Sequence, residues 1–354
     1  MTIQWYPGHM HKARREMAAA LDGVDALIEV RDARLPASSA NPALAELGGH
    51  LPRLVVLSRT DLADPAATAG WLDALAGETG AALALDLGDA AAARPVPGAL
   101  ERLAGPAPAS REGPRTAMVV GIPNVGKSTL ANRLAGRAVA ATGDEPAVTK
   151  RQQTVRLAGA AGDRWRLRDT PGVLWPNLAN PRAGYRLAAS GAVRDTATDS
   201  ADVALALVGF LHALYPRALA ARYGPALAAP ADGDAPDGDA PGDTPDGHAL
   251  DADDLDAGDG IDPAALADLE AIGRARGCLG GGGLVDLDRA GRVLLADFRA
   301  GRLGRITLET PAVAARERAW TEARVADIEA AREAKREARR ARRKRSAAAR
   351  RGGA

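Results

Sequence analysis

The chain of 354 residues is poor in cysteine, in aromatic residues and in long apolar runs. Its single cysteine, Cys278, excludes an intramolecular disulfide and a cysteine-rich metal site, and it fits a reducing compartment. Aromatic residues make up 3% of the chain and apolar residues 46%, so any core must consist mainly of alanine, leucine and valine. No stretch approaches the ~18 consecutive apolar residues of a membrane span, and the N-terminal segment has no apolar signal-peptide core. We expect a cytoplasmic protein without membrane contacts, and we expect it to be monomeric.

Lysine is also scarce, since it occurs at only five positions and arginine supplies the other basic residues. The formal net charge of +1 hides two segments of opposite sign. Residues 231–262 contain twelve aspartates and no lysine or arginine, whereas residues 332–351 contain eleven basic residues and two glutamates. A segment rich in aspartate, glycine and proline cannot bury enough apolar surface to fold alone, so we expect an acidic disordered insertion over 230–262. The basic segment suits a polyanionic partner.

Apolar runs alternate with helical patterns in the first half of the chain, which predicts an α/β domain with a parallel sheet flanked by helices. The predicted strands include 54–57, 81–86, 116–120 and 165–170. The stretch 90–114 is rich in alanine, proline and glycine, and it is expected to be a loose connection. From Arg186 the pattern becomes helical. We therefore predict an α/β domain over 1–185, a helical domain over 186–312 and a basic helical or disordered tail over 313–354.

The segment GIPNVGKS (121–128) matches G-x-x-x-x-G-K-[ST], and it lies between an apolar strand and a helical pattern, as a phosphate-binding loop requires. Its glycines permit a tight turn through which backbone N–H groups approach a phosphate, and the N-terminus of the next helix adds a favourable dipole. Lys127 is expected to neutralise β- and γ-phosphate oxygens, and Ser128 to coordinate Mg²⁺. The nucleotide contacts expected here are Asn124, Val125, Gly126, Lys127, Ser128 and Thr129.

The segment DTPGVLWP (169–176) fits the partner loop that senses a γ-phosphate. Asp169 ends a predicted strand and is expected to hold Mg²⁺, while the N–H of Gly172 is expected to meet the γ-phosphate. Thr149 lies between the two loops and is the candidate switch residue that adds a second Mg²⁺ oxygen, although a threonine in a loop is more often only a turn residue. Val173 and Leu174 follow where a water-orienting glutamine often stands, so another residue must act on the water.

Guanine recognition usually depends on an N-K-x-D segment after a strand, and the degraded match LSRTD (57–61) precedes the phosphate loop. Asp61 can accept hydrogen bonds from both N–H donors of guanine, which adenine does not present. Ser58 and Arg59 replace the asparagine and the lysine; Arg59 can still lie flat against the base, but the serine weakens the match. The region 84–86, with Asp86, is a weaker candidate for the next guanine-contacting turn.

The base-reading segment thus precedes the phosphate loop, the switch threonine and DTPG. This order predicts a circularly permuted P-loop GTPase domain, because the same sheet can be built after the chain is cut and rejoined. The permutation attaches a second domain directly after DTPG, so movement of the switch can pass to it.

In this order, the segments WYPGHMHKARRE (5–16), DARLP (32–36), GIPNVGKST, GDEPAVTKRQQ (143–153) and DTPGVLWP resemble the YlqF-type ribosome biogenesis GTPase A family. The stretch 273–309 is similar to the helical rRNA-binding domain of that family, and the resemblance covers roughly residues 3 to 310. It implies a GTP hydrolase for a late step of 50S subunit assembly that binds GTP or GDP and Mg²⁺, contacts rRNA and is stimulated by the subunit. The family implies nothing about the acidic insertion or the basic tail.

The resemblance also implies roles for two side chains. His9 matches a histidine implicated in catalysis, which could position or deprotonate water or bind the transition state; the alternative is that WYPGHM only packs on the domain. Asn124 matches an asparagine that coordinates K⁺ in related GTPases; the alternative is an ordinary turn residue.

Five arginines of the second domain are candidate contacts to the rRNA of the 50S precursor, or ordinary solvated charges: Arg274, Arg276, Arg299, Arg302 and Arg305. Two other functions stay open at this point. One is an rRNA-binding assembly scaffold with weak or lost GTP turnover, suggested by the degraded LSRTD. The other is a permuted GTPase of the small subunit, which we rank lower because the chain lacks an additional N-terminal barrel and zinc-binding cysteines.

Overall fold

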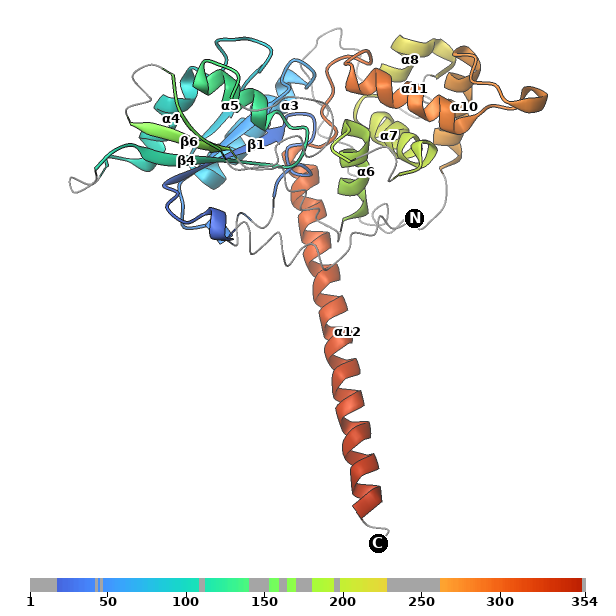
Figure 1. Cartoon of the computed structure of the whole chain (residues 1–354). Coiled ribbons are helices and arrows are strands. Elements are labelled where there is room, and N and C mark those ends of the chain that lie inside the picture. Colours follow the sequence, from blue (N-terminus) through green and yellow to red (C-terminus); the bar gives the residue numbers. More distant parts are fainter. Residues whose placement is uncertain are drawn as a thin grey trace.

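The computed structural model describes residues 18–41, 44, 47–107, 112–139, 153–158, 164–169, 180–193, 198–227 and 262–351. Figure 1 shows an α/β domain beside a helical domain, with one long helix extending away from both. Residues 230–261 of the predicted acidic insertion and the segment around His9 lie outside the described residues, whereas Asp262 is described and caps the helix that follows.

Six strands form one sheet in the order β3-β2-β1-β4-β6-β5. Every neighbouring pair is parallel except β5 and β6, so the sheet is mostly parallel, as predicted. Strands β1 and β2 are almost completely buried, which suits a parallel sheet covered on both faces. The strand bounds are β1 (Ala26–Asp32), β2 (Arg53–Ser58), β3 (Ala82–Ala84), β4 (Arg115–Val120), β5 (Gln153–Arg156) and β6 (Trp165–Asp169).

Helices cover the two faces of the sheet. Helices α4 (Pro95–Ala104) and α5 (Lys127–Ala135) share one apolar cluster with Val30 and Val56 of the sheet. Helix α3 (Pro65–Thr79) packs on the opposite face, where its Trp71 joins Val55. The sequence starts α3 sharply, because Asp64 accepts hydrogen bonds from two backbone N–H groups of the first turn and proline follows it.

Helix α4 corrects the prediction of a loose connection over 90–114. Pro95 and Pro97 lie in its first turn, where proline is tolerated, and Val96, Ala99 and Leu100 are buried against the sheet. The proline and glycine content that suggested a loop is therefore compatible with a short amphipathic helix.

The second domain is helical. Helix α7 packs against α6, α10 and α11, and α11 comes so close to α7 that a Cβ on Gly291 would lie 2.5 Å from the carbonyl oxygen of Ser200. The elements are α6 (Pro181–Ser190), α7 (Ser200–Leu214), α8 (Ala218–Tyr223), η3 (Pro225–Leu227), α10 (Pro263–Ala275), η4 (Gly281–Gly283) and α11 (Leu287–Arg299).

Helix α12 (Pro311–Arg351) begins two residues before the basic helical or disordered tail predicted over 313–354, and it includes the basic segment. Its first turns bury Val313 and Ala314, and Ala314 packs with Trp71 of α3. The rest of the helix projects from the body of the molecule (Figure 1). Among the described residues, no helix combines the length and the apolar character needed to cross a membrane.

A buried ionic cluster ties the two domains and α12 together; we call Arg186, Glu309 and Glu317 the Glu309 cluster. Arg186 of α6 donates two hydrogen bonds of 2.7 Å to Glu317 of α12 and one of 3.2 Å to Glu309. Glu309 also accepts from the backbone N–H and the hydroxyl of Ser38 in the loop after β1. Asn180, which caps α6, donates to Glu317 at 2.8 Å. The start of α6 is thus fixed to α12 and to the loop after β1.

Candidate nucleotide-binding site

The loops after β1, β2, β3 and β4 meet at one edge of the sheet, because these strands are parallel. Ligands of open α/β sheets bind outside the carboxyl ends of the strands. The phosphate loop follows β4, the LSRTD segment follows β2, and the DARLP segment follows β1. Strand β6 ends at Asp169 beside Val119 of β4, so its carboxyl end lies at the same edge.

The phosphate loop has the backbone that its glycines predict. Gly121 has a φ of 148°, and a Cβ there would lie 2.4 Å from the carbonyl oxygen of Val30. Gly126 has a φ of 92°, and a Cβ would lie 3.0 Å from a methyl group of Leu87. Helix α5 begins at Lys127, so Ser128 and Thr129 lie in its first turn, where the direction of the backbone N–H groups and the helix dipole favour an anion. Lys127 is buried and donates to the Ile122 carbonyl at 2.6 Å. This cradle fits a nucleotide phosphate.

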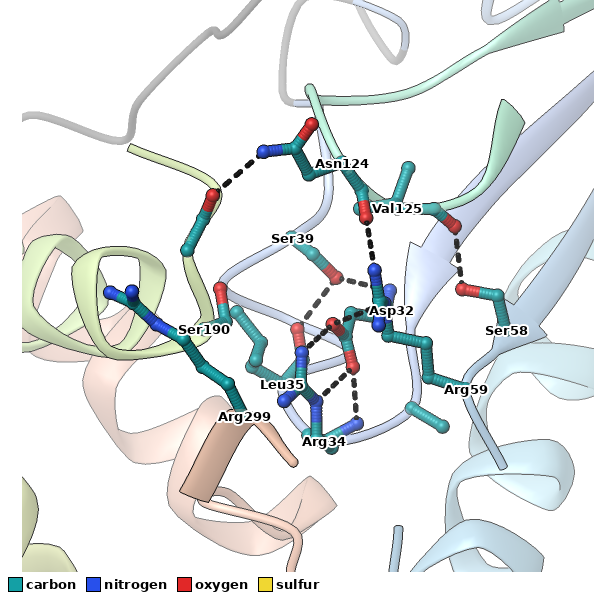
Figure 2. Close-up of polar contacts among 12 residues, drawn as sticks. Asp32, Arg34, Leu35, Ser39, Ser58, Arg59, Asn124, Val125, Ser190 and Arg299 are labelled. Carbon is teal, nitrogen blue, oxygen red and sulfur yellow. Dashed lines mark hydrogen bonds and ion pairs between the residues drawn. The ribbon is translucent and has the colours of Figure 1, made fainter. Parts of the chain in front are cut away.

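Two side chains of the LSRTD segment reach backbone carbonyls of the phosphate loop. Ser58 Oγ lies 2.7 Å from the carbonyl of Val125 and 3.0 Å from that of Arg31, and with one proton it donates to only one of them at a time. Arg59 has a φ of 55°, and its Nη2 donates to the carbonyl of Asn124 at 3.1 Å. Figure 2 shows both side chains reaching the loop. The serine and the arginine therefore hold the LSRTD segment against the phosphate loop.

The two acidic residues predicted to read guanine, Asp61 and Asp86, are both exposed at this edge. Asp86 accepts from the N–H of Gly88 at 2.8 Å and so shapes its own turn. Arg133 of α5 donates to the carbonyls of Leu87 and Gly88, which holds this turn beside the phosphate loop. Sequence reasoning missed Arg133, because its contact joins segments far apart in the chain.

The DARLP segment, which follows β1, contains a buried ion pair between Asp32 and Arg34 that was not predicted from the sequence. Asp32 accepts two hydrogen bonds from the guanidinium of Arg34, at 3.0 and 2.7 Å, and one from its backbone N–H (Figure 2). Burial alone would raise the pKa of Asp32, but the charges and hydrogen bonds of Arg34, with the nearby Arg59, outweigh it and lower the pKa. The Arg34 guanidinium also lies 5.2 Å from the ring centre of Phe298 in α11. Arg34 therefore links the loop after β1, at the carboxyl edge of the sheet, to the helical domain.

Asn124 of the phosphate loop contacts the helical domain directly. It has a φ of 62°, and its side-chain amide donates to the carbonyl of Gly191, just after α6, at 2.8 Å (Figure 2). Arg299 at the end of α11 donates to the carbonyls of Ala188 and Ala189 in the same turn. The C-terminal turn of α6 is thus held from one side by the phosphate loop and from the other by α11.

Six predicted site residues, Ser58, Arg59, Asn124, Val125, Gly126 and Lys127, are brought together by these contacts. Ser128 and Thr129 follow them in α5, and Asp169 ends the neighbouring strand β6. His9, Thr149 and Gly172, with Val173 and Leu174, lie outside the described residues. Their roles stay predictions.

A phosphate loop that follows the fourth strand and the LSRTD segment that follows an earlier one, joined at one sheet edge, form the arrangement predicted for a circularly permuted P-loop GTPase. The family model described as a 50S ribosome-binding GTPase matches residues 116–219. Ribosome biogenesis GTPase A of Priestia megaterium is 37% identical over 322 residues, which cover 89% of this chain and 99% of that protein. The same-named protein of Bacillus cereus is 37% identical over 318 residues, 88% of this chain and 95% of that protein.

The crystal structure of GNP-bound YlqF from T. maritima has the same fold, with a TM-score of 0.55 at 21% identity, covering 85% of this chain and 98% of that one. The chain belongs to the ribosome biogenesis GTPase A family. It is therefore a GTP hydrolase that binds guanine nucleotides, as the sequence predicted.

Proposed function

We propose that this GTPase acts at a late step of large (50S) ribosomal subunit assembly in the cytoplasm, as a monomer that binds the rRNA of the precursor particle. The names of the relatives and the description of the family model support the ribosomal role. In this proposal, nucleotide binding is coupled to the helical domain. The observation that supports the coupling is the hydrogen bond from Asn124 to Gly191, because it joins the phosphate loop to that domain. A change in the loop on GTP binding thereby alters the surface presented to the particle.

In the proposed site, Lys127 and the N–H of Gly172 hold the γ-phosphate, while Asp61 reads guanine and Arg59 lies against the base. Ser128, Thr149 and Asp169 would hold Mg²⁺, which supplies charge stabilisation to the phosphate oxygens when it is bound. Asn124 would contribute to a K⁺ site, in keeping with its place in the phosphate loop. His9 acts on the water, because Val173 and Leu174 have no polar group that could do so.

The test is GTP turnover in K⁺ and Mg²⁺, with and without purified 50S subunits, for the wild type and His9→Ala. We expect the subunit to stimulate the wild type, and His9→Ala to lose roughly 10²-fold or more of the stimulated rate, as removal of a general base does. His11→Ala is the matched control, because it removes a neighbouring histidine and should keep the stimulation.

Three further conditions separate the alternatives. Replacing K⁺ by Na⁺ at equal ionic strength tests the monovalent site, and adding 30S subunits instead of 50S tests the small-subunit alternative. Lys127→Ala should abolish turnover in every condition. Wild-type protein that binds rRNA without any subunit-stimulated turnover would overturn this proposal in favour of an assembly scaffold.

A further inference from the structure

One carboxylate of the helical domain organises several arginines at the protein surface. Asp297, in the last turn of α11, is buried and accepts hydrogen bonds from Arg222 Nε at 2.8 Å and from Arg302 Nη1 at 2.8 Å. Arg276 Nη2 lies 3.8 Å from the same carboxylate, and the hydroxyl of Tyr223 donates to it at 3.0 Å. We call Asp297, Arg222, Arg276 and Arg302 the Asp297 cluster.

The cluster carries an excess of positive charge, since three guanidiniums surround one carboxylate. Burial alone would raise the pKa of Asp297, but hydrogen bonds from Arg222, Arg302 and Tyr223 outweigh it and lower the pKa to about 2. The carboxylate is therefore ionised at neutral pH, and the formal sum is three positive charges minus one, or +2. In the described part of the chain, no other acid lies within ion-pair distance of these three arginines.

The arginines keep their outer faces open to solvent. Their side chains are 31% (Arg222), 35% (Arg276) and 56% (Arg302) exposed. Each guanidinium has five N–H donors, and Arg222 uses its Nε for Asp297, so donors remain for a second anion. The ring of Tyr223 lies 5.1 Å from the Arg276 guanidinium and 6.0 Å from that of Arg222, which restrains both side chains.

The helix ends place these residues together. Arg222 lies in the last turn of α8, Arg276 caps the end of α10, and Arg302 follows α11. Cations are favoured at the C-termini of helices. Two other arginines predicted as rRNA contacts bond to backbone carbonyls within the protein. Arg299 donates to carbonyls of α6, and Arg305 donates to the carbonyls of Thr60 and Ala63.

We propose that Arg222, Arg276 and Arg302, held in place by Asp297, form the surface of the helical domain that binds the phosphate backbone of rRNA. This inference rests on the proposed function and specifies its RNA contact. Preordered guanidiniums suit phosphate because they can form bidentate, charge-assisted hydrogen bonds without losing much side-chain freedom. The shared carboxylate sets the spacing of the three arginines.

The test is the affinity of the full-length protein for protein-free rRNA extracted from large subunits, measured over a series of salt concentrations. We expect Arg302→Gln to weaken binding several-fold and to reduce the slope of log K against log salt by about 1, because it removes one phosphate contact. Arg302→Lys should restore part of the affinity, since it keeps the charge. The Arg222→Gln/Arg276→Gln/Arg302→Gln variant should reduce the slope by about 3.

Arg274→Gln and Arg292→Gln are matched controls, because these exposed arginines of α10 and α11 pair with an acid four residues away. They should leave the slope nearly unchanged. GTP turnover without subunits and the far-ultraviolet circular dichroism should match the wild type in Arg302→Gln, which shows that the variant folds.

The outcomes separate this inference from the proposed function. Failure of the wild type to bind either rRNA or 50S subunits would contradict both. Wild-type rRNA binding that Arg302→Gln and the triple variant leave unchanged would overturn the surface alone. Loss of 50S binding in the variants with unchanged rRNA binding would show a ribosomal protein as the partner, and it would also overturn the inference.

Discussion

The Glu309 cluster and the Asp297 cluster have opposite charge balances. The Glu309 cluster combines one arginine with two glutamates, and the exposed fractions of the Arg186, Glu309 and Glu317 side chains are 0%, 1% and 7%. The Asp297 cluster combines one aspartate with three arginines that reach solvent. In the first cluster every charge is turned inward and joins elements of both domains. In the second the excess charge is turned outward, where the three arginine side chains are 31–56% exposed and accessible to an anion in solution.

The difference lies in how each excess charge is compensated. Glu309 is buried with an excess of negative charge, and backbone and hydroxyl donors from the loop at Ser38 compensate for part of it. Burial is the main cause that raises the pKa of Glu309, and the charge of Glu317 adds to it. The excess positive charge of the Asp297 cluster is hydrated, so it needs no internal partner and is available to an external anion.

The largest effect is expected from Arg186→Met. This change leaves Glu309 and Glu317 buried without their guanidinium, and removing one partner of a buried pair costs about 3–5 kcal/mol of unfolding free energy. Urea denaturation of the wild type and the variant measures it. The Arg186→Met/Glu317→Gln variant should recover most of the loss, because Glu309 keeps its donors at Ser38. A cost below about 1 kcal/mol would show that the cluster does not hold the domains together.

Features whose interacting residues are close together in the sequence could be predicted, and individual side-chain contacts between residues far apart in the sequence could not. The phosphate loop could be predicted because strand, glycines, lysine and helix are contiguous, and the structure gives Gly121 and Gly126 the predicted turn. The LSRTD segment could be placed beside it because parallel strands end at one edge. The role of Arg34 could not be predicted, since its second contact, Phe298, lies on α11, far away in the sequence.

The arginines of the helical domain show the same limit. Charge alone selected Arg274, Arg276, Arg299, Arg302 and Arg305 as candidates, without distinguishing those that serve the fold. The structure shows that Arg299 and Arg305 satisfy backbone carbonyls. It also adds Arg222, which precedes the acidic insertion and is brought to Asp297 only by the packing of α8. Sequence identifies the kind of side chain, and tertiary contacts decide which ones remain available.

A smaller effect on the free energy of unfolding is expected from acid titration. The contributions of Asp297 and Glu309 to this free energy change in opposite directions with pH. The pKa of Asp297 is lowered from 3.8 to about 2, so its contribution to stability is present above about pH 4 and is lost as the pH falls toward 2. The shift corresponds to about 2 kcal/mol. Glu309 acts oppositely, because its raised pKa makes its contribution decline as the pH rises above about 4.5.

Urea denaturation of the wild type and Asp297→Asn from pH 2 to pH 6 measures this difference. The stability advantage of the wild type should shrink by about 2 kcal/mol between pH 4 and pH 2. A pH-independent difference would mean that the carboxylate is not ionised preferentially in the folded state. The Glu309 contribution is common to both proteins and cancels in the comparison.

The smallest effect on stability is expected from Arg302→Gln, although this change is expected to weaken RNA binding. Arg302 is 56% exposed, and Arg222 and Tyr223 continue to donate to Asp297 after its removal. An exposed ion pair contributes about 0–1 kcal/mol, so the free energy of unfolding should change by less than about 1 kcal/mol. Thermal and urea denaturation measure it. A loss of about 3 kcal/mol, similar to that expected for Arg186→Met, would place the Asp297 cluster with the structural ion pairs and would remove the contrast between an inward and an outward excess of charge.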